Sequence, residues 1–323
     1  MKISLLNKNF IVIDTREKIT IADSFVVRQN KIGSGNGEAK LYIGNESAEL
    51  RNFFGNKGFV IKCFLLKKDL INYLDETKVE YLKPEQPYIN KNNLPALWRE
   101  RKTKIDSLPE KIEFRLIEQE QISGPRVYVK SDDITYQIIR ELSLPNITYI
   151  SVVKLLNNDN KTEYYFRLFA DYFGNITHPY LIKEEEEELE TMQNIEEKTV
   201  KSKARIGQGK YREELLNQCP FCPITLISDD RLLIASHIKP WAKSNDKEKI
   251  DPFNGFMFTP TFDYLFDKGF ISFTNDKKII LSPFLSKMTY SKLGICDNKH
   301  FPSLPINGRE NYLKYHRDEI LKR

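Results

Sequence analysis

The sequence is poor in cysteine and has no long apolar run. Four cysteines in 323 residues are too few for a disulfide framework, so metal binding or plain burial is the better interpretation of the close pair Cys219 and Cys222. No stretch of about 18 apolar residues occurs. We therefore predict no membrane-spanning helix and no membrane partner.

The N-terminus also lacks the marks of a secretory signal. Its first residues, MKISLLNKNFIVID, place charged and polar side chains inside the apolar stretch and offer no small-residue cleavage site. The segment instead has the character of a first β-strand. We therefore predict a cytoplasmic protein.

Hydrophobic residues make up 40% of the chain and aromatic residues 12%, which is typical of an ordered protein. A length of 323 residues allows two domains, each with its own core. Residues 198–323 carry 22 lysines and arginines against 14 acidic residues, whereas residues 1–197 carry 28 against 31. The basic excess favours a polyanionic partner, although an ordinary lysine-rich surface explains it equally well.

The first half is expected to be rich in strands. Alternating apolar runs predict them at NFIVID, GFVIKCFLL, KIEFRLIEQEQI and RVYVK. ITYISVVKLL and TEYYFRLFADYF predict a hairpin closed by the turn-forming residues NNDNK. DDITYQIIRELSL begins with aspartates suited to capping and has helical spacing. These elements predict an α+β fold, and the polar, proline-bearing region near 83–107 is a candidate join between two lobes.

The sharpest change in composition is the acidic run Glu184–Glu188. Adjacent glutamates repel one another and make a poor cage for one ion. Together with the helix formers around them, they predict a solvated helix or a semi-rigid linker. We therefore assign residues 1–180 to an N-terminal region, 181–200 to an acidic helical linker and 201–323 to a C-terminal domain.

One stretch of the C-terminal domain, from His237 to Asp267, gathers groups with catalytic potential. It contains an imidazole at His237, a carboxamide at Asn254 in an Asn-Gly turn, and carboxylates at Asp263 and Asp267. The two aspartates are four residues apart, which on a helix places them on one face, close enough to share a cation. The residues alone therefore suggest a hard divalent metal beside a histidine general base.

The motifs around this stretch resemble a known family. In chain order they are RIGQGKYREELL, CPFCPITL, IASHIKPW, DPFNGFMFTPTFDYLFDKGFISF and NYLKYHRDEIL. They resemble the C-terminal nuclease domain of HNH restriction-type endonucleases, also called ββα-metal or His-Me finger nucleases. The resemblance implies a two-stranded hairpin and a helix that grip one divalent ion. The expected fold class is thus α+β, with a strand-rich N-terminal DNA-recognition region followed by a small ββα-metal HNH nuclease domain at 201–323.

The resemblance also implies roles for the residues of the stretch. His237 corresponds to the general base that activates a water molecule. Asn254 matches the middle residue, which either fixes the loop and the histidine orientation or contacts the metal. Asp263 stands at the third position, where histidine is frequent, so the motif is HND in this chain. A carboxylate at that position suits Mg²⁺ or Mn²⁺ better than softer ions.

Further candidates surround these three residues. Asp267, one helical turn after Asp263, is expected to be a second metal ligand or a brace for the helix. Ser236 precedes the base, where related sites often have a ligand, but a hydroxyl is a weak one. Lys239 and Lys268 are candidates to support the charge of the phosphate.

The cysteines suggest a second metal. Cys219 and Cys222 have the spacing of half a zinc knuckle, and Cys296 with His300 has ligand-like spacing for the other half. A structural Zn²⁺ on these four residues would stabilise a domain that buries little apolar surface. Some HNH nucleases carry zinc between two CxxC pairs, whereas this chain has CxxC and CxxxH. Simple burial of the cysteines is the alternative.

The resulting functional hypothesis is a restriction-type endonuclease that hydrolyses double-stranded DNA. Its N-terminal region would read a target sequence or a modified base, and a homodimer is expected if both strands of a palindrome are cut. One alternative is a DNA-binding or regulatory protein with a vestigial nuclease site, in which Ser236 and Asp263 are traces of decay. Another is a toxin nuclease, for which a delivery segment is expected. The presence of His237 and Asn254 favours the endonuclease.

Overall fold

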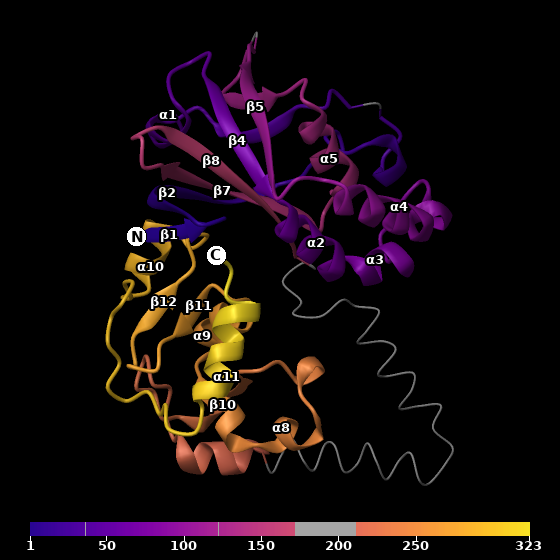
Figure 1. The fold of residues 1–323 in the computed structure, drawn as a ribbon. Helices are drawn as coiled ribbons and strands as arrows, with labels where there is room; N and C mark the ends of the chain where they lie inside the picture. The colour runs from indigo at the N-terminus through magenta and orange to yellow at the C-terminus, as the bar shows by residue number, and fades with distance from the viewer. Residues whose placement is uncertain (36, 122, 172–210) are drawn as a thin grey trace. The chain divides into compact units, whose positions relative to one another are not determined.

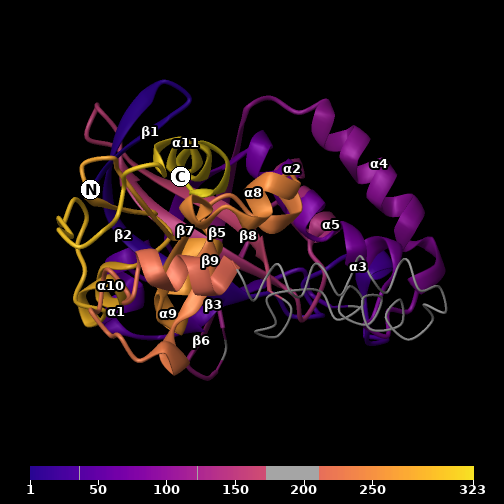
Figure 2. The same cartoon turned by 90° about the horizontal axis from the view of Figure 1, so that it is seen from below.

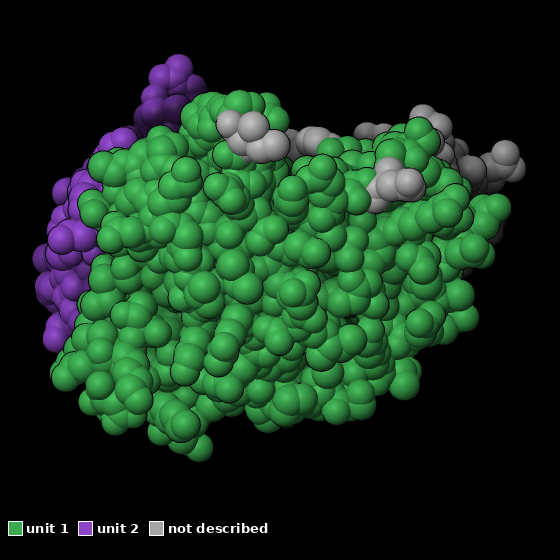
Figure 3. Space-filling model, turned by 90° about the horizontal axis from the view of Figure 1, so that it is seen from above, with its two compact units in different colours: residues 1–187 green, residues 188–323 purple. Residues whose placement is uncertain are grey.

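The computed structural model describes residues 1–35, 37–121, 123–171 and 211–323. The chain forms two compact units, residues 1–187 and residues 188–323, coloured separately in Figure 3. Each unit is described by itself. The predicted acidic linker at 181–200 lies outside the described residues.

An eight-stranded sheet forms the first unit (Figure 1). Its strand order is β1-β2-β7-β8-β4-β5-β6-β3. Neighbouring strands are antiparallel except β4 and β8, which pair in parallel. The strands are β1 (Lys2–Leu5), β2 (Lys8–Thr20), β3 (Leu41–Asn45), β4 (Val60–Leu66), β5 (Lys111–Gln119), β6 (Arg126–Lys130), β7 (Thr148–Leu156) and β8 (Thr162–Ala170).

Helices pack beside this sheet, and α2 to α5 lie together in both views (Figure 1, Figure 2). One buried apolar cluster includes Leu65 of β4 as well as Leu116 and Val152, which come from after the predicted join near 83–107. That region therefore runs within one compact unit and does not separate two lobes. The helices are α1 (Ala48–Phe54), α2 (Lys67–Glu76), α3 (Lys78–Leu82), α4 (Leu94–Asp106) and α5 (Ile134–Leu142), with short 3₁₀ turns η1 (Arg28–Asn30) and η2 (Lys91–Asn93).

The strand-rich α+β expectation for this half is confirmed. The hairpin predicted across NNDNK is β7–β8, which pairs from Thr148 opposite Ala170 to Leu156 opposite Thr162. Asn157 closes its turn by accepting hydrogen bonds from the backbone N–H groups of Asp159 and Lys161. The predicted helix is α5, which buries its periodic apolar residues in the core.

The second unit contains the predicted ββα succession. Strands β9 (Ile234–His237) and β10 (Gly255–Phe258) pair antiparallel, and helix α9 (Pro260–Asp267) follows. The connection between the strands holds η4 (Trp241–Lys243), α8 (Asp246–Ile250) and η5 (Pro252–Asn254), while η3 (Asp230–Leu232) precedes them and residues 211–218 are helical. Downstream lie β11 (Ile271–Phe273), β12 (Ile279–Leu281), α10 (Lys287–Lys292), α11 (Glu310–Tyr315) and the π-helix η6 (His316–Ile320).

Aromatic packing holds the ββα unit together. Phe256, Phe258, Phe266 and Phe273 are fully buried, and each ring contacts the other three. The imidazole of His316 stacks on Phe266 at a centroid distance of 3.9 Å, and burial lowers its pKa to about 3. This histidine is thus a neutral part of the core. Across the described parts of both units, no helix has the length and apolar character needed to cross a bilayer.

Candidate active site

The β9–β10 hairpin places the candidate base opposite a glycine. His237 ends β9 and pairs with Gly255, the first residue of β10. A Cβ atom on Gly255 would lie 2.0 Å from the hydroxyl of Tyr211 and 3.0 Å from the carbonyl oxygen of Ser236. The glycine is therefore required for space, because it lets Tyr211 reach the hairpin and donate a hydrogen bond to the Asn254 carbonyl at 3.1 Å.

Two aromatic rings hold the imidazole of His237. Tyr211 stacks on it with a centroid distance of 4.3 Å, and Trp241 meets it edge-on at 5.5 Å. The ring nitrogen Nε2 lies 3.0 Å from the carbonyl oxygen of Lys249. Because a carbonyl only accepts, Nε2 must carry the proton, which leaves Nδ1 as the basic nitrogen. Burial lowers the pKa of His237, so the neutral, basic form prevails at neutral pH.

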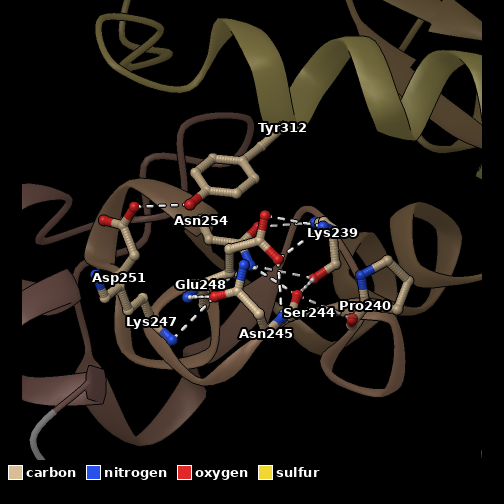
Figure 4. Close-up of polar contacts among 9 residues, drawn as sticks. All are labelled: Lys239, Pro240, Ser244, Asn245, Lys247, Glu248, Asp251, Asn254 and Tyr312. Carbon is tan, nitrogen blue, oxygen red and sulfur yellow. Dashed lines mark hydrogen bonds and ion pairs between the residues drawn. The ribbon is translucent and has the colours of Figure 1, made fainter.

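Asn254 organises the loop between the two strands, as Figure 4 shows. Its side chain is fully buried. The amide oxygen accepts a hydrogen bond from the Lys239 backbone N–H at 2.8 Å. The amide nitrogen lies 3.2 Å from the Lys239 carbonyl, 3.0 Å from the Glu248 carbonyl and 3.3 Å from the Ser244 hydroxyl. Of the two roles predicted for Asn254, these contacts support loop fixing and not contact with a metal.

The same loop contains a capped short helix (Figure 4). Asn245 accepts hydrogen bonds from the backbone N–H groups of Lys247 and Glu248, and the Glu248 side chain accepts one from the Asn245 backbone N–H. Glu248 also binds the ammonium of Lys239 at 2.7 and 2.8 Å. The cap therefore fixes α8, which carries the Lys249 carbonyl. Lys239 would have to leave Glu248 to contact a phosphate.

The two aspartates of α9 differ in exposure. Asp263 is 9% exposed and is hydrogen-bonded to Ser236 of β9. Burial raises the pKa of Asp263, and the nearby charge of Asp267 raises it further. Asp267 is exposed and lies 3.4 Å from the ammonium of Lys268. Both residues lie on α9, one helical turn apart, and a cation bound between two such carboxylates would relieve their repulsion.

The described residues do not form a complete metal cage by themselves. Among the described residues, no group of three or more histidine, cysteine, aspartate or glutamate side chains is placed to hold an ion. The pair Asp263 and Asp267 supplies hard oxygen ligands of the kind that Mg²⁺ takes, since Mg²⁺ usually keeps waters and substrate phosphates beside one or two carboxylates. The donor set thus fits a hard divalent ion that completes its shell from water and substrate.

The four predicted zinc ligands do not come together. Cys219 and Cys222 are buried, whereas Cys296 and His300 are exposed. The Cys219 thiol lies 3.3 Å from the Phe221 carbonyl, and burial raises its pKa. The expectation of a zinc on these residues is therefore not supported, and burial, the alternative, describes the first pair.

Three residues near the base were not predicted as part of the site. Tyr211 and Trp241 contact the imidazole of His237, and Arg309 donates a hydrogen bond from Nε to the Gly255 carbonyl at 2.9 Å. Tyr211 and Trp241 lie in two of the motifs that resemble HNH nucleases, at KYREELL and HIKPW. Their aromatic side chains were the feature of the sequence that could have indicated contact with the histidine. Nothing in the sequence around Arg309 points to the hairpin.

Comparison with known proteins is informative for this second unit. No curated protein matches the chain. Residues 222–274 match a family model described as HNH endonuclease. The match begins at Cys222, includes the whole of β9, β10 and α9, and ends just after β11. The C-terminal part of the chain therefore carries an HNH nuclease domain, which implies a hydrolase that acts on DNA.

Proposed function

We propose that this protein is a restriction-type endonuclease that cuts double-stranded DNA with a divalent metal and a histidine general base. The observation that carries the proposal is the state of His237, whose Nε2 is tied to the Lys249 carbonyl so that Nδ1 is basic. The imidazole stands on a ββα unit inside the HNH match. The helix that follows the hairpin, α9, carries the carboxylates Asp263 and Asp267.

In the proposed reaction, Nδ1 of His237 takes a proton from the attacking water. Tyr211 and Trp241 keep the ring in one orientation and reduce its contact with solvent. Ring orientation matters because general base catalysis needs the accepting nitrogen within hydrogen-bond reach of the water. Asn254 acts indirectly, because it holds the loop whose Lys249 carbonyl fixes the imidazole ring of His237.

Asp263 and Asp267 are the residues proposed to hold Mg²⁺ or Mn²⁺, with Ser236 bracing the first carboxylate. When bound, such an ion stabilises the negative charge that develops on phosphate and leaving-group oxygens. Lys268, which lies beside Asp267, is proposed to support the phosphate charge. Lys239 is a weaker candidate for that role because Glu248 already binds its ammonium.

The N-terminal unit is proposed to read a target sequence or a modified base in the cytoplasm. A homodimer would allow both strands of a palindrome to be cut. The direct test incubates the full-length chain with methylated and unmethylated plasmid, in Mg²⁺ and in excess chelator. Discrete fragments that require Mg²⁺ support the proposal. Uniform degradation would indicate a toxin nuclease, and binding without cutting a regulatory protein with a vestigial site.

The rate of cleavage should depend on pH in a way that reflects the burial of His237. Because its pKa is lowered from 6.5, the imidazole stays neutral until the pH falls below that value. We therefore expect kcat/KM to be flat from neutral pH down past 6.5 and to fall only in more acidic buffer. Steady-state cleavage of a labelled duplex over this range measures the acid limb of the profile, the pH range in which kcat/KM falls.

Trp241→Ala provides the matched variant for this profile. This change exposes the imidazole of His237. Because burial is the main cause of its lowered pKa, the acid limb of the profile should move to higher pH, toward 6.5. An acid limb at or above 6.5 in the unmodified protein would argue against His237 as the group that titrates.

A further inference from the structure

The first unit contains a nearly buried lysine whose ammonium is poorly paired. The side chain of Lys31 is 4% exposed, and its Nζ lies 3.9 Å from an oxygen of Asp23. Among the described residues, no atom accepts a hydrogen bond from this ammonium. An ammonium has three donors, and buried charges are normally paired and hydrogen-bonded. The position is therefore one that an external acceptor would complete.

Lys31 is one of the residues that line a hollow. Its volume is about 210 Å³, and it is lined by Arg28, Lys31, Gly33, Ser34, Gly35 and Ile89. The glycines leave space, and a Cβ atom on Gly35 would meet nothing within 4 Å. The Arg28 side chain is exposed at the rim. The residues around this space thus include a lysine, an arginine and a serine, and the space has room for a small polar group.

The backbone around Lys31 is held in place before any ligand arrives. The amide of buried Asn30 donates to the carbonyls of Glu141 and Ser143 at 2.8 and 2.7 Å, and its oxygen accepts from Arg101 at 2.7 Å. The carbonyl of Lys31 accepts from the Ile89 N–H at 2.8 Å. Such preorganisation lowers the free energy that binding would otherwise lose to ordering the loop.

The charges around the hollow favour an anionic ligand. Asp23, the acidic residue nearest the ammonium, accepts backbone hydrogen bonds from Ile32 and Gly33 at 2.7 and 3.2 Å. Its carboxylate therefore fixes the loop and only partly neutralises two cations. We infer that this hollow binds a single phosphate group. The assignment of that group to a DNA backbone rests on the proposed function, because the first unit is the proposed DNA reader.

The test uses the full-length chain with His237→Ala, so that DNA is bound but not cut. Lys31→Met keeps the length of the side chain and removes its charge. We expect the affinity for a labelled duplex to fall about tenfold, uniformly across sequences, and the slope of log K against log salt to become shallower by about one. Fluorescence anisotropy at several salt concentrations measures both quantities. Lys68→Met, which removes an exposed lysine of α2, is the matched control and should change neither.

Arg28→Gln keeps the test decisive if Lys31→Met fails to fold, because Arg28 is exposed. It should weaken duplex binding in the same uniform, salt-dependent way. Unchanged affinity and salt slope in the folded variants would overturn the assignment of the phosphate to a DNA backbone, even if the unmodified chain cuts DNA. Weaker binding by Lys31→Met in a chain that never cuts DNA would support the phosphate site and count against the nuclease proposal.

Inorganic phosphate distinguishes the source of the ligand. Titration of the full-length protein with phosphate, followed by calorimetry, should show binding that Lys31→Met abolishes. If phosphate binding is lost while duplex binding is unchanged, the hollow takes a free phosphate compound and the assignment to DNA is wrong. If phosphate binds equally to both proteins and duplex binding is also unchanged, the site itself is refuted.

Discussion

Replacing His237 by alanine is expected to lower the rate of DNA cleavage about a thousandfold and to leave DNA binding nearly unchanged. A positioned general base contributes about 10²- to 10⁴-fold to such reactions. The imidazole is held between Tyr211 and Trp241 and tied to the Lys249 carbonyl, and alanine has no group that accepts a proton. Single-turnover cleavage of a labelled duplex in Mg²⁺ measures the rate, and anisotropy measures binding.

The control variant is His300→Ala, which removes an exposed imidazole of the same domain. It should cleave at the rate of the unmodified protein, and thermal unfolding should be similar for both variants. If His237→Ala cleaves as fast as His300→Ala, the HNH domain would remain but another group must activate the water. Loss of binding together with cleavage would instead indicate that His237 contacts DNA.

The ββα unit could be predicted because it is local in sequence. Its base, loop and helix lie within the stretch His237 to Asp267, and the prediction came from the resemblance of the motifs in that stretch to HNH nucleases. The four-residue spacing of Asp263 and Asp267 carried information because one helical turn brings them together. The individual strands of the first unit and the β7–β8 hairpin were predictable from local patterns of apolar and turn-forming residues.

Contacts made by the backbone or between distant segments were not predictable. The tautomer of His237 depends on a carbonyl of Lys249, and any residue type supplies a carbonyl. In the first unit, β4 pairs in parallel with β8, although the two strands are far apart in the sequence. The pattern of a strand does not reveal which distant strand it pairs with. The polar region near 83–107 was therefore interpreted as a boundary between lobes. The zinc prediction is not supported for a similar reason, because suitable spacing alone does not bring Cys219 and Cys296 together.

Replacing Asn254 is expected to destabilise the active-site loop strongly, although its side chain carries no charge. Replacing it with alanine removes one acceptor and two donors from a fully buried position. The backbone N–H and carbonyl of Lys239 and the carbonyl of Glu248 would then lack partners. Each buried polar group left unsatisfied costs about 1 to 3 kcal/mol. We expect a loss of about 3 kcal/mol, visible in calorimetry of the full chain as a lower melting temperature.

Asn254→Asp separates hydrogen bonding from size. It keeps the acceptor for the Lys239 N–H but turns the donor end into an oxygen that faces the carbonyls of Lys239 and Glu248. Repulsion and burial of the charge should make this isosteric change at least as destabilising as Asn254→Ala. The exposed Asn217→Ala is the control and should be neutral. A metal-binding role predicts the opposite order, since a carboxylate would then bind the ion more strongly and the aspartate variant would keep its activity. Comparing cleavage and melting for the two variants therefore decides between loop fixing and ligation.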